Sequence, residues 1–211
     1  MRFGAIIQNQ VRPGDVFAMG DSAELIWELL GEIDGWRRIS ARPGIAGELG
    51  AIVERETGVA VGYDDAVYQT LRKPAPPFHD SIVRVLTLRD LPLLEAAAPE
   101  VRGRGFGDVT KLLDEGIVAC AIVDGEIVTC ARTEAVTDRH ADIRVSTLEP
   151  WRGRAFATAA ASMVAGRAQD SGRVPVWNAK LDDYPSLRIA DKLGFEEVSR
   201  RTLIDRSPAG N

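Results

Sequence analysis

Cysteine and histidine are scarce in this chain, and their scarcity limits the chemistry that the chain can perform. The 211 residues include two cysteines, Cys120 and Cys130, and two histidines, His79 and His140. Two cysteines cannot form a structural metal site by themselves, and the two histidines lie far apart in the sequence. We therefore expect no metal site.

Long apolar runs and an excess of positive charge are also missing. No stretch approaches the ~20 apolar residues that cross a bilayer. Residues 1–15 show neither a long apolar run nor a small-residue cleavage pattern, so a secretory signal is not expected. The sequence thus favours a cytoplasmic protein with no membrane partner. The net charge of −5, from 26 basic and 31 acidic residues, argues against general nucleic-acid binding.

The overall composition is that of a globular protein. Hydrophobic residues make up 45% of the chain and charged residues 27%, which excludes wholesale disorder. A Pro-rich run at 73–78 cannot continue a helix or a central strand, so it is expected to be a linker or a crossing loop. We therefore divide the chain into an N-terminal lobe, residues 1–76, and a larger domain, residues 77–211.

Residues 1–76 have the pattern of a small α/β lobe. Helical patterns occupy 21–30 and 45–56, and Gly58 ends the second. Short β-rich pieces at 16–18 and 67–70 flank them. No residue of this lobe indicates a particular chemistry, so its role is left open.

In the larger domain the patterns alternate between strand and helix. Strands are expected at 81–88, 116–123, 126–133, 141–148, 174–179 and 195–204, and helices at 90–98, 108–115, 155–169 and 185–193. This order predicts an α/β fold, or more strictly an α+β mixed sheet, with one parallel β-α-β crossover.

An Asp-Gly pair at 124–125 joins two β-rich runs and is a strong hairpin signal. Continuous pairing from a two-residue turn would place Cys120 opposite Thr129 and Cys130 opposite Ala119. The two thiols would then point to opposite faces of the sheet. We interpret both as buried structural cysteines.

The loop at 149–154, between a strand and an Ala-rich helix, offers the clearest sign of a binding function. A loop of small residues that opens a helix leaves backbone N–H groups free at the positive end of the helix dipole. Phosphate is the natural ligand of such a helix end. Arg152 and Arg154 add positive charge beside it. The alternative is a well-packed crossover helix whose arginines are only solvated.

Two motifs resemble the GNAT superfamily of N-acetyltransferases. The segment 151–158, Trp-Arg-Gly-Arg-Ala-Phe-Ala-Thr, looks like that superfamily's acyl-CoA pyrophosphate loop, Gln/Arg-x-x-Gly-x-Gly/Ala. The segment 186–195 looks like its C-terminal motif, an Asn-x-x-Ser start and a helix that ends in Lys-Leu-Gly-Phe. The resemblance covers residues 81–205 and is closest to the branch that includes zwittermicin-type antibiotic resistance acetyltransferases.

This resemblance implies a GNAT-like fold with a splayed central mixed sheet, to which the N-terminal α/β lobe is an addition. It also implies transfer of an acetyl group from acetyl-CoA, as cosubstrate, to a primary amine of a small molecule. One alternative is a non-catalytic acyl-CoA-binding or sensing module. Another is an interaction protein whose N-terminal lobe fills the cleft. Formation of a homodimer is left open.

By the resemblance, the cofactor-binding residues lie on the strand at 141–148, in the loop after it and at the start of the last helix. They are Val145, Ser146, Thr147, Arg152, Gly153, Arg154, Ala155, Ala157, Thr158, Asp183 and Ser186. Three positions depart from the family pattern. Ala155 replaces the central Gly, Asp183 replaces the usual Asn, and Ala190 stands where many members carry a tyrosine that could protonate the leaving thiolate.

An amine must lose its proton before it can attack, so a carboxylate is expected near the acceptor. Asp142 is the first candidate for this base and Glu134 the second, although either could be a plain surface carboxylate. With Ala190 in place of the tyrosine, Ser186 is the candidate for the acid, since it lies four residues earlier on the same helix face. Tyr184 is expected to pack rather than to react.

A second segment, Arg102–Gly107, fits the pyrophosphate pattern more literally. It follows a helix instead of a strand and precedes a helix of about two turns. Its amides would therefore not converge on a phosphate. We interpret it as a loop, and leave open whether it covers the acceptor site.

Overall fold

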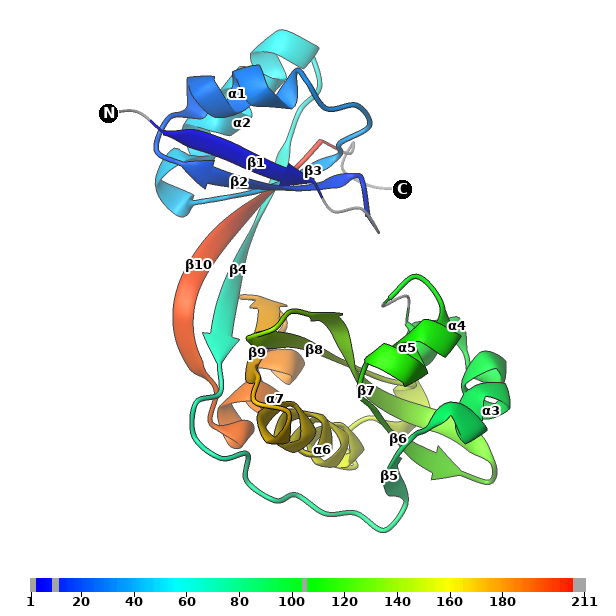
Figure 1. Cartoon of the computed structure of the whole chain (residues 1–211). Coiled ribbons are helices and arrows are strands. Elements are labelled where there is room, and N and C mark those ends of the chain that lie inside the picture. The colour runs from blue at the N-terminus through cyan, green and yellow to red at the C-terminus, as the bar shows by residue number, and fades with distance from the viewer. Residues whose placement is uncertain (1–2, 9–11, 104–105, 207–211) are drawn as a thin grey trace. The chain divides into compact units, whose positions relative to one another are not determined.

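A computed structural model describes residues 3–8, 12–103 and 106–206, which form two compact units (Figure 1). Unit 1 contains the described residues up to 67, with 180–182 and 199–206. Unit 2 contains the described residues in 68–179 and 183–198. Neither unit is one continuous stretch of chain, so the two units do not test a single boundary at residue 76. That boundary stays a prediction.

The strands of the described residues form a mixed sheet in the order β1-β2-β3-β10-β4-β9-β8-β7-β6-β5. Their bounds are β1 Gly4–Gln8, β2 Asp15–Gly20, β3 Arg38–Ala41, β4 Gly62–Thr70, β5 Val83–Val85, β6 Val118–Val123, β7 Glu126–Val136, β8 His140–Thr147, β9 Val174–Lys180 and β10 Glu196–Asp205. The mixed α/β fold predicted from the sequence is confirmed.

Seven α-helices connect these strands within the described part of the chain. They are α1 Ala23–Leu30, α2 Pro43–Thr57, α3 Leu91–Ala96, α4 Pro99–Arg102, α5 Val109–Glu115, α6 Phe156–Asp170 and α7 Tyr184–Leu193. Two 3₁₀ turns, η1 Leu88–Asp90 and η2 Glu149–Trp151, precede α3 and α6. The predicted parallel crossover is β8-α6-β9, and its strands are parallel.

In unit 2, helices cover both faces of the sheet (Figure 1). Side chains alternate across a strand, so neighbouring residues face different helices. Ala131 and Ile143 pack with α6 and α7, and the alanines of α6 allow this helix to lie close to the sheet. Cys120 and Cys130 pack with α3, α4 and α5 on the other face.

The Pro-rich run is a crossing loop, one of the two forms that its composition allowed. It lies along α6, whose polar side chains bind its backbone. Gln169 accepts a hydrogen bond from the Ala75 N–H at 2.9 Å and donates to the Lys73 carbonyl at 2.7 Å. Ser162 donates to the Pro76 carbonyl at 2.6 Å. These side-chain hydrogen bonds satisfy backbone groups of the loop that a strand would have paired with a neighbouring strand.

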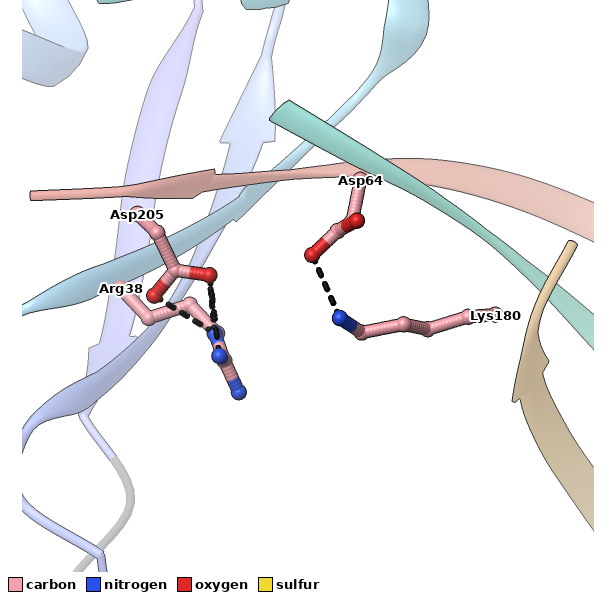
Figure 2. A network of polar contacts seen from close by, with 4 residues as sticks. All are labelled: Arg38, Asp64, Lys180 and Asp205. Atoms are coloured by element: carbon pink, nitrogen blue, oxygen red, sulfur yellow. Dashed lines mark hydrogen bonds and ion pairs between the residues drawn. The ribbon is translucent and has the colours of Figure 1, made fainter. Parts of the chain in front are cut away.

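Unit 1 has its own core between its strands and the helices α1 and α2. Figure 2 shows two ion pairs of this unit. Arg38 of β3 donates to both carboxylate oxygens of Asp205 of β10, from Nε at 3.0 Å and from Nη2 at 2.9 Å. The Lys180 ammonium lies 2.5 Å from Asp64 of β4. The buried Arg201 guanidinium donates to backbone carbonyls of β2 and β3.

The order of elements in unit 1 repeats that of the second half of unit 2. β1 pairs antiparallel with β2, α1 leads to the parallel strand β3, and α2 leads to β4. Likewise β7 pairs antiparallel with β8, α6 leads to the parallel strand β9, and α7 leads to β10. In the strand order, β10 lies between β3 and β4, and β4 lies between β10 and β9. The N-terminal lobe is therefore built on the same topology as the segment that carries the two motifs.

The predicted register of the hairpin is wrong. The Asp-Gly turn forms as expected, with φ of +51° and +82°, but Cys120 lies opposite Cys130 rather than Thr129. The pairing shifts between Ala121 and Ile122, which leaves Val128 of β7 as an extra residue. Such a bulge moves every later pair by one position. The two thiols consequently share one face of the sheet.

The predicted strand at 81–88 is shorter than expected, covering only Val83–Val85. The chain turns early because Thr87 and Asp90 form a capping box at the start of η1. The strands β1 and β3 and the one-turn helix α4 were not predicted from the sequence.

Candidate functional site

The turn between β8 and α6 presents open backbone amides at a helix N-terminus. Gly153 and Ala155 have left-handed conformations, with φ of +78° and +63°. Ala155 is the N-cap of α6, and no side chain caps this helix end. The first turn of α6 also lacks an acidic residue. Successive amides in such a turn form a concavity that suits an anion.

Two arginines flank this turn. The Arg154 guanidinium lies 4.6 Å from the centre of the Trp151 ring, and Arg152 Nε donates to the Thr147 carbonyl at 3.4 Å. Both arginines are exposed, so their remaining donors face solvent. Ala157 is half-buried in the first turn, whereas the side chain of Thr158 is buried against the core.

The strands β8 and β9 pair only along their first residues. Their register ends with Ile143 opposite Trp177, although β8 continues to Thr147. On its other side, β8 remains paired with β7 through Val145, Ser146 and Thr147. The backbone groups of these three residues that point toward β9 thus have no ladder partner. A separation of this kind is the splay that the resemblance implies.

The start of α7 contains Asp183 and Ser186. Asp183 accepts a hydrogen bond from the Ser186 N–H at 3.1 Å and so caps the helix. The Ser186 hydroxyl accepts a hydrogen bond from the indole N–H of the buried Trp177 at 3.1 Å. Ala190 is fully buried, while Tyr184 is 65% exposed, so the prediction that Tyr184 packs is wrong.

The two candidate bases lie at the same end of the β7–β8 ladder. Thr133 pairs with Ile143 and Ala135 pairs with Asp142, so Glu134 is the extra residue of a second bulge. Bulges redirect a side chain, and they are frequent beside active sites. The Glu134 carboxylate lies 3.5 Å from Arg132 Nε, and Asp142 accepts a hydrogen bond from the Asn178 amide at 2.8 Å.

Sequence reasoning missed three polar side chains near these carboxylates: Arg132 of β7, Arg144 of β8 and Asn178 of β9. Arg132 lies opposite Arg144 in the ladder, and Arg144 donates to the side-chain oxygen Oδ1 of Asn178 at 3.3 Å. The alternation along β8, which puts Asp142 and Arg144 on one face, could have indicated Arg144. The sequence contains no signal for its contact with Asn178.

The cysteines are structural rather than reactive. The contact with Cys130, followed by burial, raises the pKa of the Cys120 thiol. The same contact lowers the pKa of Cys130, but both cysteines are buried in the core, out of reach of a substrate. This agrees with their interpretation as core residues, although their register differs from the predicted one.

The corresponding turn of unit 1 is closed to anions. Only two residues separate β2 from α1, and the Ser22 hydroxyl accepts a hydrogen bond from the Leu25 N–H at 3.4 Å. Glu24 adds negative charge in the first turn of α1. Of the two repeated turns, only the one before α6 therefore has an uncapped helix end.

The Arg102–Gly107 segment begins at the last residue of α4 and precedes α5, a helix of seven residues. The Asp108 carboxylate caps α5 by accepting from the Lys111 N–H at 2.8 Å. An acid therefore occupies the place that a phosphate would need. Residues 104 and 105 of this segment lie outside the described residues.

Two absences hold for the described part of the chain. None of its helices combines the length and the apolar character needed to cross a membrane. None of its His, Cys, Asp and Glu side chains form a group of three that could hold a metal ion.

Comparison with solved structures shows a shared fold. A GCN5-related N-acetyltransferase-like protein from Streptococcus suis is 19% identical, with 97% of this chain and 88% of that chain covered and a TM-score of 0.67. GCN5-related N-acetyltransferases from Sphaerobacter thermophilus (16% identical, 100% and 78% covered, TM-score 0.61) and Kribbella flavida (18%, 93% and 82%, 0.59) are also similar. Comparison with curated proteins gave no match.

The fold and the family match together support an acyltransferase. Residues 100–203 match the profile of the GNAT acetyltransferase family. This segment contains both motifs, the uncapped turn before α6 and the separated strands β8 and β9. The match covers less than half of the chain, and this segment is similar to that family of acetyltransferases.

Proposed function

We propose that this chain transfers an acetyl group from acetyl-CoA to a primary amine of a small molecule. The observation that carries the proposal is the uncapped N-terminus of α6, directly after a central strand and flanked by Arg152 and Arg154. Such a helix end suits a pyrophosphate, because its amides and dipole attract negative charge. The resemblance to zwittermicin-type antibiotic resistance acetyltransferases supports a small-molecule acceptor.

The residues present fit acetyl-CoA. Gly153, Arg154, Ala155, Ala157 and the amide of Thr158 would surround the pyrophosphate, and no acidic side chain of the first turn opposes it. The backbone of Val145, Ser146 and Thr147 would hold the pantetheine arm. Acetyl-CoA supplies the activated acyl group as a thioester. A backbone N–H of β8 that polarises the thioester carbonyl would contribute about 3 kcal/mol to stabilising the transition state.

Proton transfer is assigned to three side chains. Asp142, with Glu134 as the second candidate, takes a proton from the acceptor ammonium and frees its lone pair. The amine nitrogen then bonds to the acetyl carbon while the carbon–sulfur bond breaks. Ser186 donates its hydroxyl proton to the departing thiolate and takes up the proton that the acylated nitrogen loses, because its oxygen accepts from Trp177 and its own hydrogen is left to donate.

Thermal unfolding with acetyl-CoA tests the proposed cofactor site. Binding to the folded state alone stabilises it by about 2.7 kcal/mol at a ligand concentration of 100 Kd. Ala157→Glu puts a carboxylate at the second position of α6, where it favours the helix itself but repels phosphate. We expect this variant to fold and to lose the shift in Tm.

Thr110→Glu is the matched control, because Thr110 holds the same second position in α5, after the Asp108 cap. It should keep the full shift with acetyl-CoA. If Ala157→Glu binds as well as the parent, the turn before α6 is not the pyrophosphate site. Loss of the shift in Thr110→Glu alone would instead point to the Arg102–Gly107 segment.

A non-catalytic acyl-CoA-binding or sensing module is the second candidate. The observation that favours it is the buried Ala190, which replaces a tyrosine with a group that cannot donate a proton. Release of CoA in the presence of a panel of primary amines would exclude it. Binding of acetyl-CoA without any acyl transfer would favour it.

The cellular setting also belongs to the proposal. We place the protein in the cytoplasm, where acetyl-CoA would be its cosubstrate, with no nucleic-acid or membrane partner. The acidic net charge of −5 supports the absence of a nucleic-acid partner. Formation of a homodimer stays open to a measurement of mass in solution.

A further inference from the structure

Two arginines lie side by side on adjacent strands in the middle of the unit 2 sheet. Arg132 of β7 is paired with Arg144 of β8. Their neighbours Ala131 and Ile143 pack with α6, so both arginines lie on the opposite face, which α4 approaches. Like charges directly opposite each other in a ladder are destabilising unless other groups balance them.

Arg132 is balanced within the protein. It is only 4% exposed, donates to the Val101 carbonyl at 3.3 Å, and lies 3.5 Å from the Glu134 carboxylate. Its charge is therefore countered by the neighbouring acid of the same strand, and its role is to hold Glu134 in position.

The positive charge of Arg144 is not countered by a neighbouring carboxylate of the described residues. Within the described residues its one hydrogen bond goes to the neutral Asn178, at 3.3 Å, and it makes no ion pair. Its Nε is buried without a hydrogen-bond partner, as Arg132 Nε is, but only Arg132 has a carboxylate within ion-pair distance among the described residues. Burying a guanidinium donor without an acceptor is unfavourable. A bound ligand that supplies the hydrogen-bond acceptor would remove this cost.

We propose that Arg144 binds a carboxylate of the acceptor, so that the substrates are amines that also carry a carboxylate. The inference rests on the proposed acetyl transfer and specifies its acceptor. A guanidinium offers two parallel donors, which match the two oxygens of a carboxylate.

The position of the candidate base fits this class of acceptor. Asp142 and Arg144 are two residues apart on one face of β8, so their Cα atoms are separated by about 7 Å. Asn178 links them, donating to Asp142 at 2.8 Å and accepting from Arg144. An amino carboxylate can therefore direct its ammonium toward Asp142 while its carboxylate meets Arg144.

A panel of amino acids and their carboxamides tests the assignment, because each pair differs only in the anionic group. With saturating acetyl-CoA, the parent should acetylate the acids with at least a tenfold higher kcat/KM than the amides. Arg144→Gln should bring this ratio close to one, mainly by raising KM for the acids. Arg144→Lys, which keeps the charge but loses the paired donors, should retain part of the preference.

Arg167→Gln is the matched control, because Arg167 is an exposed cation on α6, against the other face of the sheet. It should keep the parent's ratio. If the parent uses amides as well as acids, or if the ratio survives Arg144→Gln, the proposal is overturned.

A binding measurement separates this failure from failure of the proposed function. With CoA present, amino acids should raise the Tm of the parent more than their amides do, and Arg144→Gln should remove that difference. Equal Tm shifts of the parent with amino acids and with their amides would overturn the role of Arg144, even where acetyl-CoA binds normally. If acetyl-CoA itself produces no shift, it is the proposed cofactor site that fails.

Discussion

The guanidinium of Arg132 lies directly against the backbone of Gly103. A Cβ atom built on Gly103 would come within 2.0 Å of Arg132 Nε. Gly103 also has a φ of +74°, in the region that favours glycine. The segment after α4 can approach this side chain because residue 103 has no side chain of its own. Arg132 in turn holds Glu134, so the contact connects the loop to one candidate base.

We expect Gly103→Ala to destabilise the protein by about 2–4 kcal/mol, since the methyl group must displace a buried guanidinium and the left-handed conformation adds strain. Urea unfolding measures the loss. Gly107→Ala is the control, because Gly107 has a φ of +85° but open space around its Cα. It should lose only the conformational part, about 1 kcal/mol. Equal losses in the two variants would show that the Arg132 contact contributes nothing.

The ion pair before α3 predicts a pH dependence of stability. The hydrogen bond from Arg84, at 2.6 Å, lowers the pKa of Asp90 from 3.8 to about 2, and the Thr87 N–H adds to the effect. A lowered pKa in the folded state stabilises the fold above pH 3.8, and this contribution is lost as the pH falls toward 2. Asp90→Asn should thus be less stable than the parent at pH 6 and equally stable near pH 2.

Unfolding by urea at several pH values between 6 and 2 would measure this difference. Arg84→Gln should reduce it, because without the guanidinium the pKa of Asp90 returns toward its usual value. A difference between Asp90→Asn and the parent that stays constant with pH would assign Asp90 a packing or capping role without an electrostatic one.

Helices with local end signals could be predicted from the sequence. Asp108 and Asp183 cap α5 and α7, and Gly58 and Gly194 end α2 and α7 in left-handed conformations. The register of β6 and β7 could not be predicted in the same way. The extra residue Val128 lies in an apolar run, where no alternation marks which side chain faces which helices.

The cofactor turn could be proposed from the sequence because its signals are contiguous: small residues, flanking arginines and the missing cap at Ala155. The residues on the acceptor side could not be predicted from the sequence. Arg144 and Asn178 are 34 residues apart in the sequence. Their contact depends on the parallel register of β8 and β9, which ends with Ile143 opposite Trp177 and which no sequence pattern marks. The second bulge, at Glu134, likewise exists only in the paired strands.

The two candidate bases can be separated by their pH dependence. If Asp142 takes the proton, Asp142→Asn should lower kcat/KM by about 10²–10⁴ near neutral pH. The defect should shrink as the pH rises, since more of the amine is then deprotonated in solution. A pH profile of kcat/KM measures this. A loss that is equal at every pH would contradict the assignment, and a pH-dependent loss in Glu134→Gln would make Glu134 the base.

The last prediction concerns the group that protonates the thiolate. A thiol titrates near pH 8.5, so a CoA thiolate needs little help to leave. Ser186→Ala should therefore cost about tenfold in kcat, close to 1.4 kcal/mol. The same change leaves the indole N–H of the buried Trp177 without its acceptor, so it should also lower the Tm.

Tyr184→Phe is the comparison, because Tyr184 begins the same helix but its side chain is 65% exposed. It should change kcat less than threefold and leave the Tm unchanged. Steady-state rates at saturating acetyl-CoA, measured beside the thermal shift, distinguish the two residues. A large fall in kcat for Tyr184→Phe with intact binding of acetyl-CoA would make Tyr184 the acid, and the Ser186 hydroxyl would then act only as the acceptor for Trp177.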